Sequence, residues 1–143
     1  MIASRKIYLD SNIFMYALEG HELYAGVLQQ LFHYIASEQI AVYTSDLTLA
    51  ECLVMPLKLA NQPLADLYKM HLTSHAGLEC LALSREVLMQ AAQLRADLNI
   101  KLPDAIHVAS ALLSECDSLL TNDRGLRAPA HLKTLQLNDF LSG

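Results

Sequence analysis

Short runs rich in Ile, Val, Leu, Thr and Tyr alternate along this chain with longer stretches of helical periodicity. This alternation restricts the fold strongly, because two parallel strands of one sheet need a crossover of a dozen or more residues between them. We therefore expect an α/β fold of three layers, with helices on both faces of a central, mainly parallel sheet of about five strands. The expected strands cover residues 6–9, 40–45, 78–83, 118–122 and 133–137.

The segments between the expected strands have the spacing of amphipathic helices. In residues 21–37, leucine, valine and isoleucine recur every four residues and would face a core. Residues 84–100 open at Ser84, a residue type that is favoured at helix N-caps. Further helices are expected at 47–60, 63–74 and 101–113, with a break near Pro56 and Pro63.

Composition limits the classes of protein to which the chain can belong. Its 143 residues suffice for one domain with a single core, expected to span residues 1–143, and 53% of them are hydrophobic. No apolar run approaches the roughly 20 residues of a membrane span, and charged residues occur early in the chain, so we expect a cytoplasmic protein with no membrane partner. The net charge of −5 argues against a protein that coats nucleic acid through bulk electrostatics.

Acidic side chains follow several of the expected strands or open the helices after them. Asp10 comes directly after the first strand, and Asp123 comes just after the fourth. Glu51 lies in the helix that follows the second strand, and Asp104 opens the last long helix. Because parallel sheets bind ligands beyond the carboxyl ends of their strands, where the following helices begin, we expect all four acids on one edge. The polar residues Asn12 and Thr121 are expected at the same edge.

Each acid also has a local structural explanation. Asp10 and Asp123 suit turns, and Asp104 suits the first turn of a helix, where it satisfies free N–H groups. Glu51 ends the sequence Thr-Leu-Ala-Glu, a capping box in which its side chain would bond the N–H of the cap residue Thr48. These explanations do not account for four acids on one edge, because clustered like charges raise each other's pKa unless a cation is present.

The residue types at this edge indicate a hard divalent cation. Carboxylates with Asn and Thr oxygens suit Mg²⁺, with Mn²⁺ as a substitute, and zinc is disfavoured. His107 lies one helical turn from Asp104 and could reach the same edge, although a lone histidine is more often packed or solvent-facing. The three cysteines are widely spaced, and the chain has no glycine-rich phosphate loop and no nucleophile elbow. A metal-activated water would make a side-chain nucleophile unnecessary.

Four segments together resemble the acidic motifs of PIN-domain nucleases, most of all the VapC-type toxins of bacterial toxin–antitoxin pairs. They are IYLDSNIFMYAL, LTLAECL, LPDAIHVASAL and LLTNDRGL, in this order, and the likeness extends to the closing LQLNDFL. The resemblance implies a PIN-like fold and a metal-dependent endoribonuclease that cuts structured RNA. It also implies a homodimer and a small antitoxin whose tail enters the acidic groove.

The same resemblance implies roles for individual residues. Asp10 and Asp104 would be the principal metal ligands, and Asp123 would adjoin them. Glu51 would ligate through water or orient the attacking water, so that all four acids belong to the catalytic set. The supporting polar positions of the family match Asn12 and Thr121.

The loop after the last acid differs from many relatives, which have an acidic or aromatic residue there. In this chain Arg124 and Arg127 follow Asp123. They are candidate contacts for RNA phosphates, because guanidinium groups bind phosphate oxygens in pairs. A solvated loop is the alternative.

Two other function classes remain in view. A Mg²⁺-dependent phosphatase of another α/β class usually needs a second acid two residues after the first, where this chain has Asn12, and a lysine at a later strand end. A non-catalytic PIN-fold interaction module would keep the fold and use the same edge as a binding surface. The complete acidic set argues against such a module without excluding it.

Overall fold

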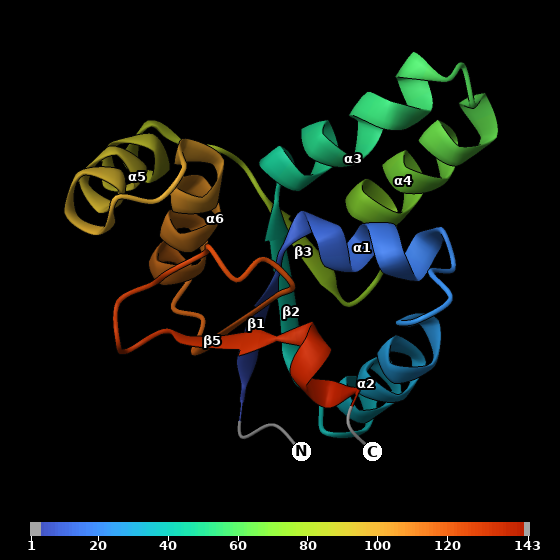
Figure 1. Ribbon diagram of the computed structural model, residues 1–143, viewed down its shortest axis with the longest axis horizontal. Helices are drawn as coiled ribbons and strands as arrows, with labels where there is room; N and C mark the ends of the chain where they lie inside the picture. Colours follow the sequence, from blue (N-terminus) through green and yellow to red (C-terminus); the bar gives the residue numbers. More distant parts are fainter. Residues whose placement is uncertain (1–3, 142–143) are drawn as a thin grey trace.

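The computed structural model describes residues 4–141 and contains a five-stranded, all-parallel sheet (Figure 1). The five expected strands are all present, and their ends differ from the predicted ends by no more than two residues. The strands are β1 Lys6–Leu9, β2 Ala41–Ser45, β3 Leu78–Leu81, β4 Ser118–Thr121 and β5 Lys133–Gln136.

The order of the strands places β1 in the middle of the sheet. The order is β3-β2-β1-β4-β5, and Ile7 of β1 pairs with Val42 of β2 on one side and Ser118 of β4 on the other. The chain therefore builds the sheet outward from β1 in one direction and then returns to add β4 on the opposite side. Such a reversal leaves a crevice at the carboxyl ends of the two central strands, which is where open parallel sheets bind ligands.

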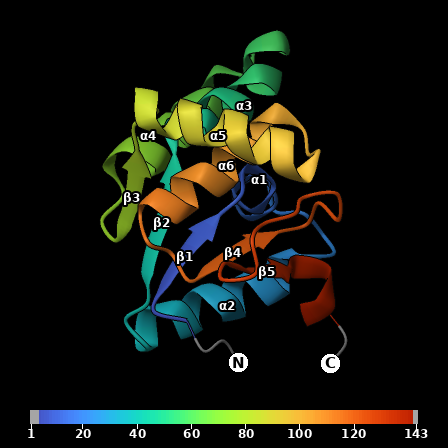
Figure 2. The same cartoon turned by 90° about the vertical axis from the view of Figure 1, so that its left-hand side faces the viewer.

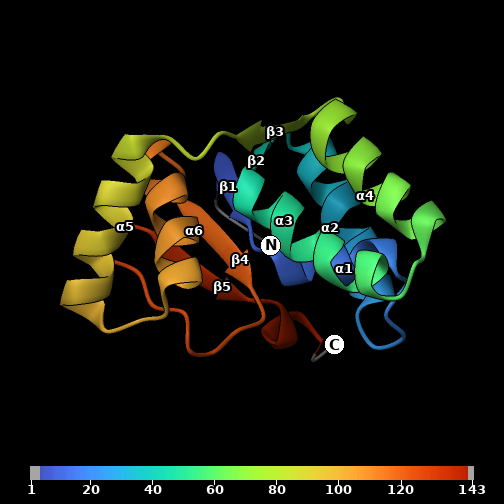
Figure 3. The ribbon, with the colours of Figure 1, turned by 90° about the horizontal axis from the view of Figure 1, so that it is seen from above.

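Helices cover both faces of the sheet and complete the three layers that the sequence predicts (Figure 3). One core packs β1 and β4 against the two helices that follow β1, and a second core packs the opposite face against α5 and α6, which lie side by side (Figure 2). The helices are α1 Ser11–Leu18, α2 Ala25–Ser37, α3 Asp46–Lys58, α4 Gln62–Ser74, α5 Arg85–Leu98, α6 Leu102–Leu113 and the short 3₁₀ helix η1 Leu137–Phe140.

The helix boundaries correct the sequence prediction in three places. Helix α2 begins at Ala25 and not at residue 21. Helix α1 was not among the expected helices; it begins directly after β1, with Asp10 as its N-cap. Helix α3 does not break at Pro56 but continues to Lys58, and the chain turns at Ala60, whose φ is 52°. The predicted cap at Ser84 is confirmed, because its hydroxyl accepts a hydrogen bond from the Val87 N–H at 3.2 Å.

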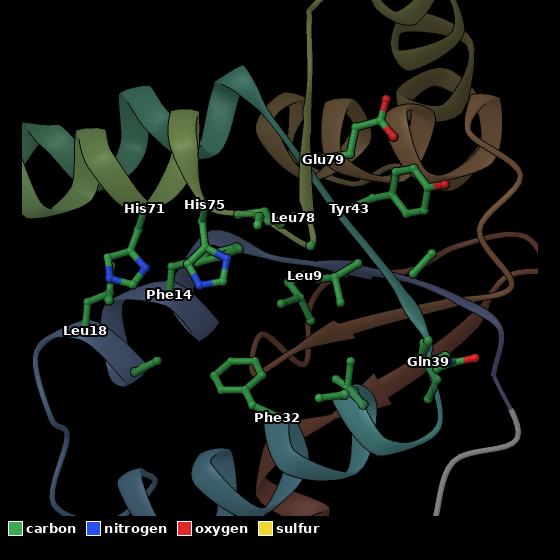
Figure 4. A pocket seen from close by; sticks show the side chains of 18 residues that line it. Leu9, Phe14, Leu18, Phe32, Gln39, Tyr43, His71, His75, Leu78 and Glu79 are labelled. Atoms are coloured by element: carbon green, nitrogen blue, oxygen red, sulfur yellow. The ribbon is translucent and has the colours of Figure 1, made fainter.

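An apolar groove of about 930 Å³ opens between α1, α2, the end of α4 and the edge of the sheet at β2 and β3. Figure 4 shows Phe32 of α2 on one side of it, and His71 of α4 and His75, which directly follows α4, on the other. The four predicted acidic residues are not among the residues that line it. None of the helices in the described part of the chain has the length and hydropathy that a membrane span requires.

Candidate functional site

Asp10 lies at the junction of β1 and α1, at the centre of the carboxyl edge of the sheet. Its backbone N–H donates to Leu120 O of β4 at 3.0 Å, and its carboxylate accepts from the Ser11 N–H at 2.7 Å. The other carboxylate oxygen accepts from the Thr121 hydroxyl at 2.6 Å. With only 4% of its surface exposed, the Asp10 carboxylate has a fixed orientation between β1 and β4.

The end of β4 holds the second acid of the edge. The Asp123 N–H donates to the Thr121 hydroxyl oxygen at 3.0 Å, so Thr121 links the backbone of Asp123 to the carboxylate of Asp10. One Asp123 carboxylate oxygen accepts from the Gly125 N–H at 2.8 Å, and a Cβ atom on Gly125 would lie 3.2 Å from that oxygen. A turn without a side chain at this position therefore keeps the carboxylate accessible.

Asn12 supports the same junction from the first turn of α1. Its side-chain oxygen accepts from the Asn122 N–H at 3.3 Å, and its amide nitrogen lies 3.5 Å from an Asp10 carboxylate oxygen. Asn12 and Thr121 thus both contact Asp10, and both join β1–α1 to the loop after β4. Both side chains therefore lie beside Asp10 at the carboxyl edge of the sheet.

Asp104 lies in the first turn of α6, the helix on the other face of the sheet, and reaches the same carboxyl edge. Burial, and then the negative charges of Asp123 and Asp10, raise its pKa from 3.8 to about 6. A carboxylate that acts only as a helix cap would have a lowered pKa, since hydrogen bonds from N–H groups favour its charged form. The raised pKa therefore reflects burial and the nearby charges of Asp123 and Asp10, which a position in the first helical turn alone does not explain.

Glu51 does not form the capping box that its sequence suggested. Helix α3 begins at Asp46 after the N-cap Ser45, so Thr48 lies inside the helix and Glu51 lies in the second turn. There its carboxylate is 2.7 Å from Nε2 of His107. Burial raises the pKa of Glu51, but the hydrogen bond and the positive charge of His107 outweigh it and lower the pKa overall.

His107 is the residue of this site whose role the sequence did not reveal. Only 1% of its surface is exposed, and Nε2 also lies 3.3 Å from an Asp10 carboxylate oxygen. The other ring nitrogen, Nδ1, is 2.7 Å from the Tyr8 hydroxyl. Burial lowers the pKa of His107, but the hydrogen bond to Glu51 and the charges of Asp10 and Glu51 raise it overall. Its spacing of three residues from Asp104 was the available signal, because residues i and i+3 share a helix face.

The donor set fits a hard divalent cation. Ligand atoms of Asp10, Glu51 and His107 all lie within 4.8 Å of one another. Asp10 and Asp123 are close enough to Asp104 for their charges to raise its pKa. Grouped carboxylates repel one another, and a cation removes that repulsion. The edge therefore has the carboxylate-rich chemistry of a site for a divalent metal ion.

The two arginines of the loop after β4 have partners on the protein surface. The Arg124 guanidinium pairs with the Asp139 carboxylate at 2.8 Å, and both side chains are mostly exposed. The Arg127 guanidinium donates to the Asn99 carbonyl at 3.1 Å. Exposed ion pairs of this kind are weak, so Arg124 can exchange its partner for a phosphate at little cost.

Comparison with known proteins identifies a family. The PIN domain family model matches residues 7–132, whereas no curated protein matches the sequence significantly. Similar solved structures include VapBC2 from Rickettsia felis bound to a promoter DNA fragment, at 20% identity and a TM-score of 0.69, with 92% of this chain and 98% of the other covered.

Two further structures share the fold. A toxin–antitoxin complex from Klebsiella pneumoniae aligns at 22% identity and a TM-score of 0.65, over 88% of this chain and 94% of the other. VapC20 from Mycobacterium tuberculosis, described as a sarcin–ricin loop cleaving toxin, aligns at 15% identity and a TM-score of 0.67, over 79% and 86%. At such identities the likeness concerns the fold, and the family model covers most of the sequence. The chain therefore belongs to the PIN domain family.

Proposed function

We propose that this chain is a metal-dependent endoribonuclease, which hydrolyses phosphodiester bonds of cytoplasmic RNA and is the toxin of a toxin–antitoxin pair. The observation that carries the proposal is the grouping of Asp10, Asp104 and Asp123 at the crevice between β1 and β4, where burial and the charges of the other two acids raise the pKa of Asp104. Membership of the PIN family and the fold of a sarcin–ricin loop cleaving toxin support the same activity.

In this proposal Asp10, Asp104 and Asp123 hold Mg²⁺, with Mn²⁺ as a substitute. The ion supplies Lewis-acid activation of water and neutralises charge on the phosphoryl oxygens. Thr121 keeps the Asp10 carboxylate directed at the crevice, through their 2.6 Å hydrogen bond. Glu51, whose carboxylate faces the same edge, orients the attacking water and accepts its proton.

The activity is tested with protein freed of any partner, total RNA, and Mg²⁺, Mn²⁺ or EDTA. We expect cleavage with either metal, none with EDTA, and none for Asp10→Asn. The matched control is Asp97→Asn, which removes a carboxylate from the exposed face of α5 and should leave cleavage unchanged. Intact RNA under all conditions, from folded protein, would favour the non-catalytic module. Phosphate release from a small monoester without RNA cleavage would favour a phosphatase.

Arg124 and Arg127 are proposed to contact RNA phosphates beside the acidic edge. Both guanidinium groups lie in the loop that begins at Asp123, and their present partners are surface groups. Replacing both with alanine should weaken RNA binding and reduce its dependence on salt concentration, since each lost phosphate contact lowers the salt slope. An unchanged salt slope would mean that the two side chains do not contact RNA phosphates.

The proposed partners are an antitoxin and a second copy of the chain. One of the similar structures is a toxin–antitoxin complex, and another is a member of the VapBC family of toxin–antitoxin systems. The apolar groove beside α1 and α2 suits an apolar segment of an antitoxin. Exposed apolar side chains at the end of α3, among them Met55, Leu57 and the C-cap Leu59, suit a homodimer. Light scattering on the chain alone, and with the product of a neighbouring small gene, measures both associations.

A further inference from the structure

His107 is a buried polar side chain with both ring nitrogens in hydrogen-bonding contact. Nε2 is 2.7 Å from Glu51 Oε1 and 3.3 Å from Asp10 Oδ1, and Nδ1 is 2.7 Å from the Tyr8 hydroxyl. An apolar side chain could fill the same volume in the core around Tyr8 and Val108 without a desolvation cost. A buried imidazole with this set of partners therefore indicates a task beyond packing.

The contacts follow from the geometry of the two elements that meet at His107. Tyr8 and Asp10 are two residues apart at the end of β1, so the alternation of side chains along a strand directs both toward α6. His107 lies three residues after Asp104 on α6, so both face the sheet edge from one side of the helix. Glu51 arrives from α3, a third element, and its carboxylate contacts the ring.

The Tyr8 hydroxyl is itself anchored. It bonds the Ser45 hydroxyl at 2.8 Å, and Tyr8 is fully buried. Ser45 occupies the N-cap position of α3 but makes no side-chain capping bond, and its hydroxyl oxygen instead accepts the hydrogen bond from Tyr8. A continuous chain of hydrogen bonds thus runs from Ser45 through Tyr8 and His107 to Glu51, and joins β2, β1, α6 and α3.

We propose that His107 is a positioning residue, which holds the Glu51 carboxylate beside Asp10 at the catalytic edge through the Ser45–Tyr8–His107–Glu51 chain of hydrogen bonds. The inference rests on the proposed nuclease function. Glu51 is half-buried and lies on a helix that approaches the edge from the end of β2. The Nε2–H group supplies a directional hydrogen bond that selects one carboxylate orientation. Partners of this kind, which orient metal-site residues, change metal affinity or activity about 10- to 100-fold when removed.

The main test is a double-mutant cycle between His107 and Glu51. We expect His107→Leu to lower the single-turnover rate of RNA cleavage by at least about tenfold with little change in the KM for RNA. His107→Gln, which keeps an amide donor, should recover part of the loss. On a Glu51→Gln background, His107→Leu should have little further effect, because the two residues act as one unit. If His107→Leu lowers the rate by the same factor in the wild type and in Glu51→Gln, the proposal is overturned. Such additivity would mean that His107→Leu acts through a general packing defect and not through Glu51.

A second readout uses Mn²⁺ alone, without RNA. Titration followed by electron paramagnetic resonance should show several-fold weaker Mn²⁺ binding for His107→Leu than for the wild type. Pulsed measurements should show no nitrogen coupling from an imidazole. Such a coupling, lost in His107→Gln, would make His107 a metal ligand and overturn its positioning role. If wild-type protein cuts no RNA, the nuclease proposal fails, while the Mn²⁺ titration still decides the role of His107.

Tyr8→Phe keeps the test open if His107→Leu does not fold. This substitution removes one hydroxyl and should slow RNA cleavage several-fold. Unfolding of the variant in EDTA, measured in parallel, checks that the protein is folded. Tyr43→Phe, in the neighbouring strand β2 and outside the chain of hydrogen bonds, is the matched control and should cut RNA at the wild-type rate. Equal rates for the two variants would overturn the proposal.

Discussion

Replacing Asp104 with asparagine should stabilise the metal-free protein at neutral and alkaline pH. Burial and the charges of Asp123 and Asp10 raise the pKa of Asp104 from 3.8 to about 6. This difference corresponds to about 3 kcal/mol. Because the side chain is only about half-buried, solvent screening reduces the effect to about 1 kcal/mol. Asp104→Asn removes the charge and should raise the free energy of unfolding by about that amount at pH 8.

The sign of the pH dependence follows from the direction of the shift. A pKa that is higher in the folded than in the unfolded protein means that the folded state binds the proton more tightly. The protonated Asp104 carboxyl therefore contributes its full stabilisation below about pH 4, and this stabilisation is lost as the pH rises through about 6. The advantage of Asp104→Asn over the wild type should therefore be small at pH 4 and reach its full size at pH 8.

Urea unfolding in EDTA, followed by circular dichroism at pH 4 and pH 8, measures this difference. Mg²⁺ at pH 8 should stabilise the wild type and remove the advantage of the variant, because the ion neutralises the same charges. The exposed Asp97→Asn is the control and should show no comparable change. If Asp104 were only a helix cap, the substitution would not stabilise the protein at pH 8. A variant less stable than the wild type at pH 8 would refute the reasoning.

Three other substitutions test parts of the same framework. Thr121→Val removes the hydroxyl between the Asp10 carboxylate and the Asp123 N–H, and should lower the free energy of unfolding by about 1–3 kcal/mol in urea titrations. Gly125→Ala places a Cβ 3.2 Å from an Asp123 carboxylate oxygen, and should weaken Mn²⁺ binding in a calorimetric titration. Asp117 has a pKa lowered, against the effect of burial, by hydrogen bonds from the Ser4 hydroxyl and from the Arg5 and Lys6 N–H groups. Its contribution to stability is present at neutral pH and lost as the pH falls, so Asp117→Asn should destabilise the protein at pH 7 and not at pH 2.5 in thermal unfolding.

The sheet and the grouping of the acids were predictable because they depend on signals within short segments. Strands of apolar, β-branched residues ended in polar residues, and parallel pairing brings such ends to one edge. Helix α1 was missed because no loop separates it from β1. Asp10 both follows the last residue of the strand and serves as the N-cap of the helix, so two apolar segments adjoin. The pattern of Thr48 and Glu51 suggested a capping box because the start of α3, at Asp46, could not be placed from the sequence.

The partners of His107 could not be predicted for a different reason. His107 and Glu51 are 56 residues apart in sequence, and their contact depends on how α6 and α3 meet over the end of β1. Local periodicity gives the face of α6 that turns inward, but it does not give the neighbour that this face will meet. The same holds for the Ser45 hydroxyl, which suits a helix cap by type and bonds Tyr8 in the folded chain.

The position of β4 beside β1 has a consequence for synthesis of the protein. Asp10 is synthesised long before Asp123, yet the two must lie at the ends of adjacent strands. Gln136 of β5 then donates a hydrogen bond to the Asp123 carbonyl at 3.2 Å. A nascent or truncated chain that ends before β4 lacks one of the central strands and one of the four acids. The order of the strands therefore delays a complete acidic edge until β4 and Asp123 have been synthesised.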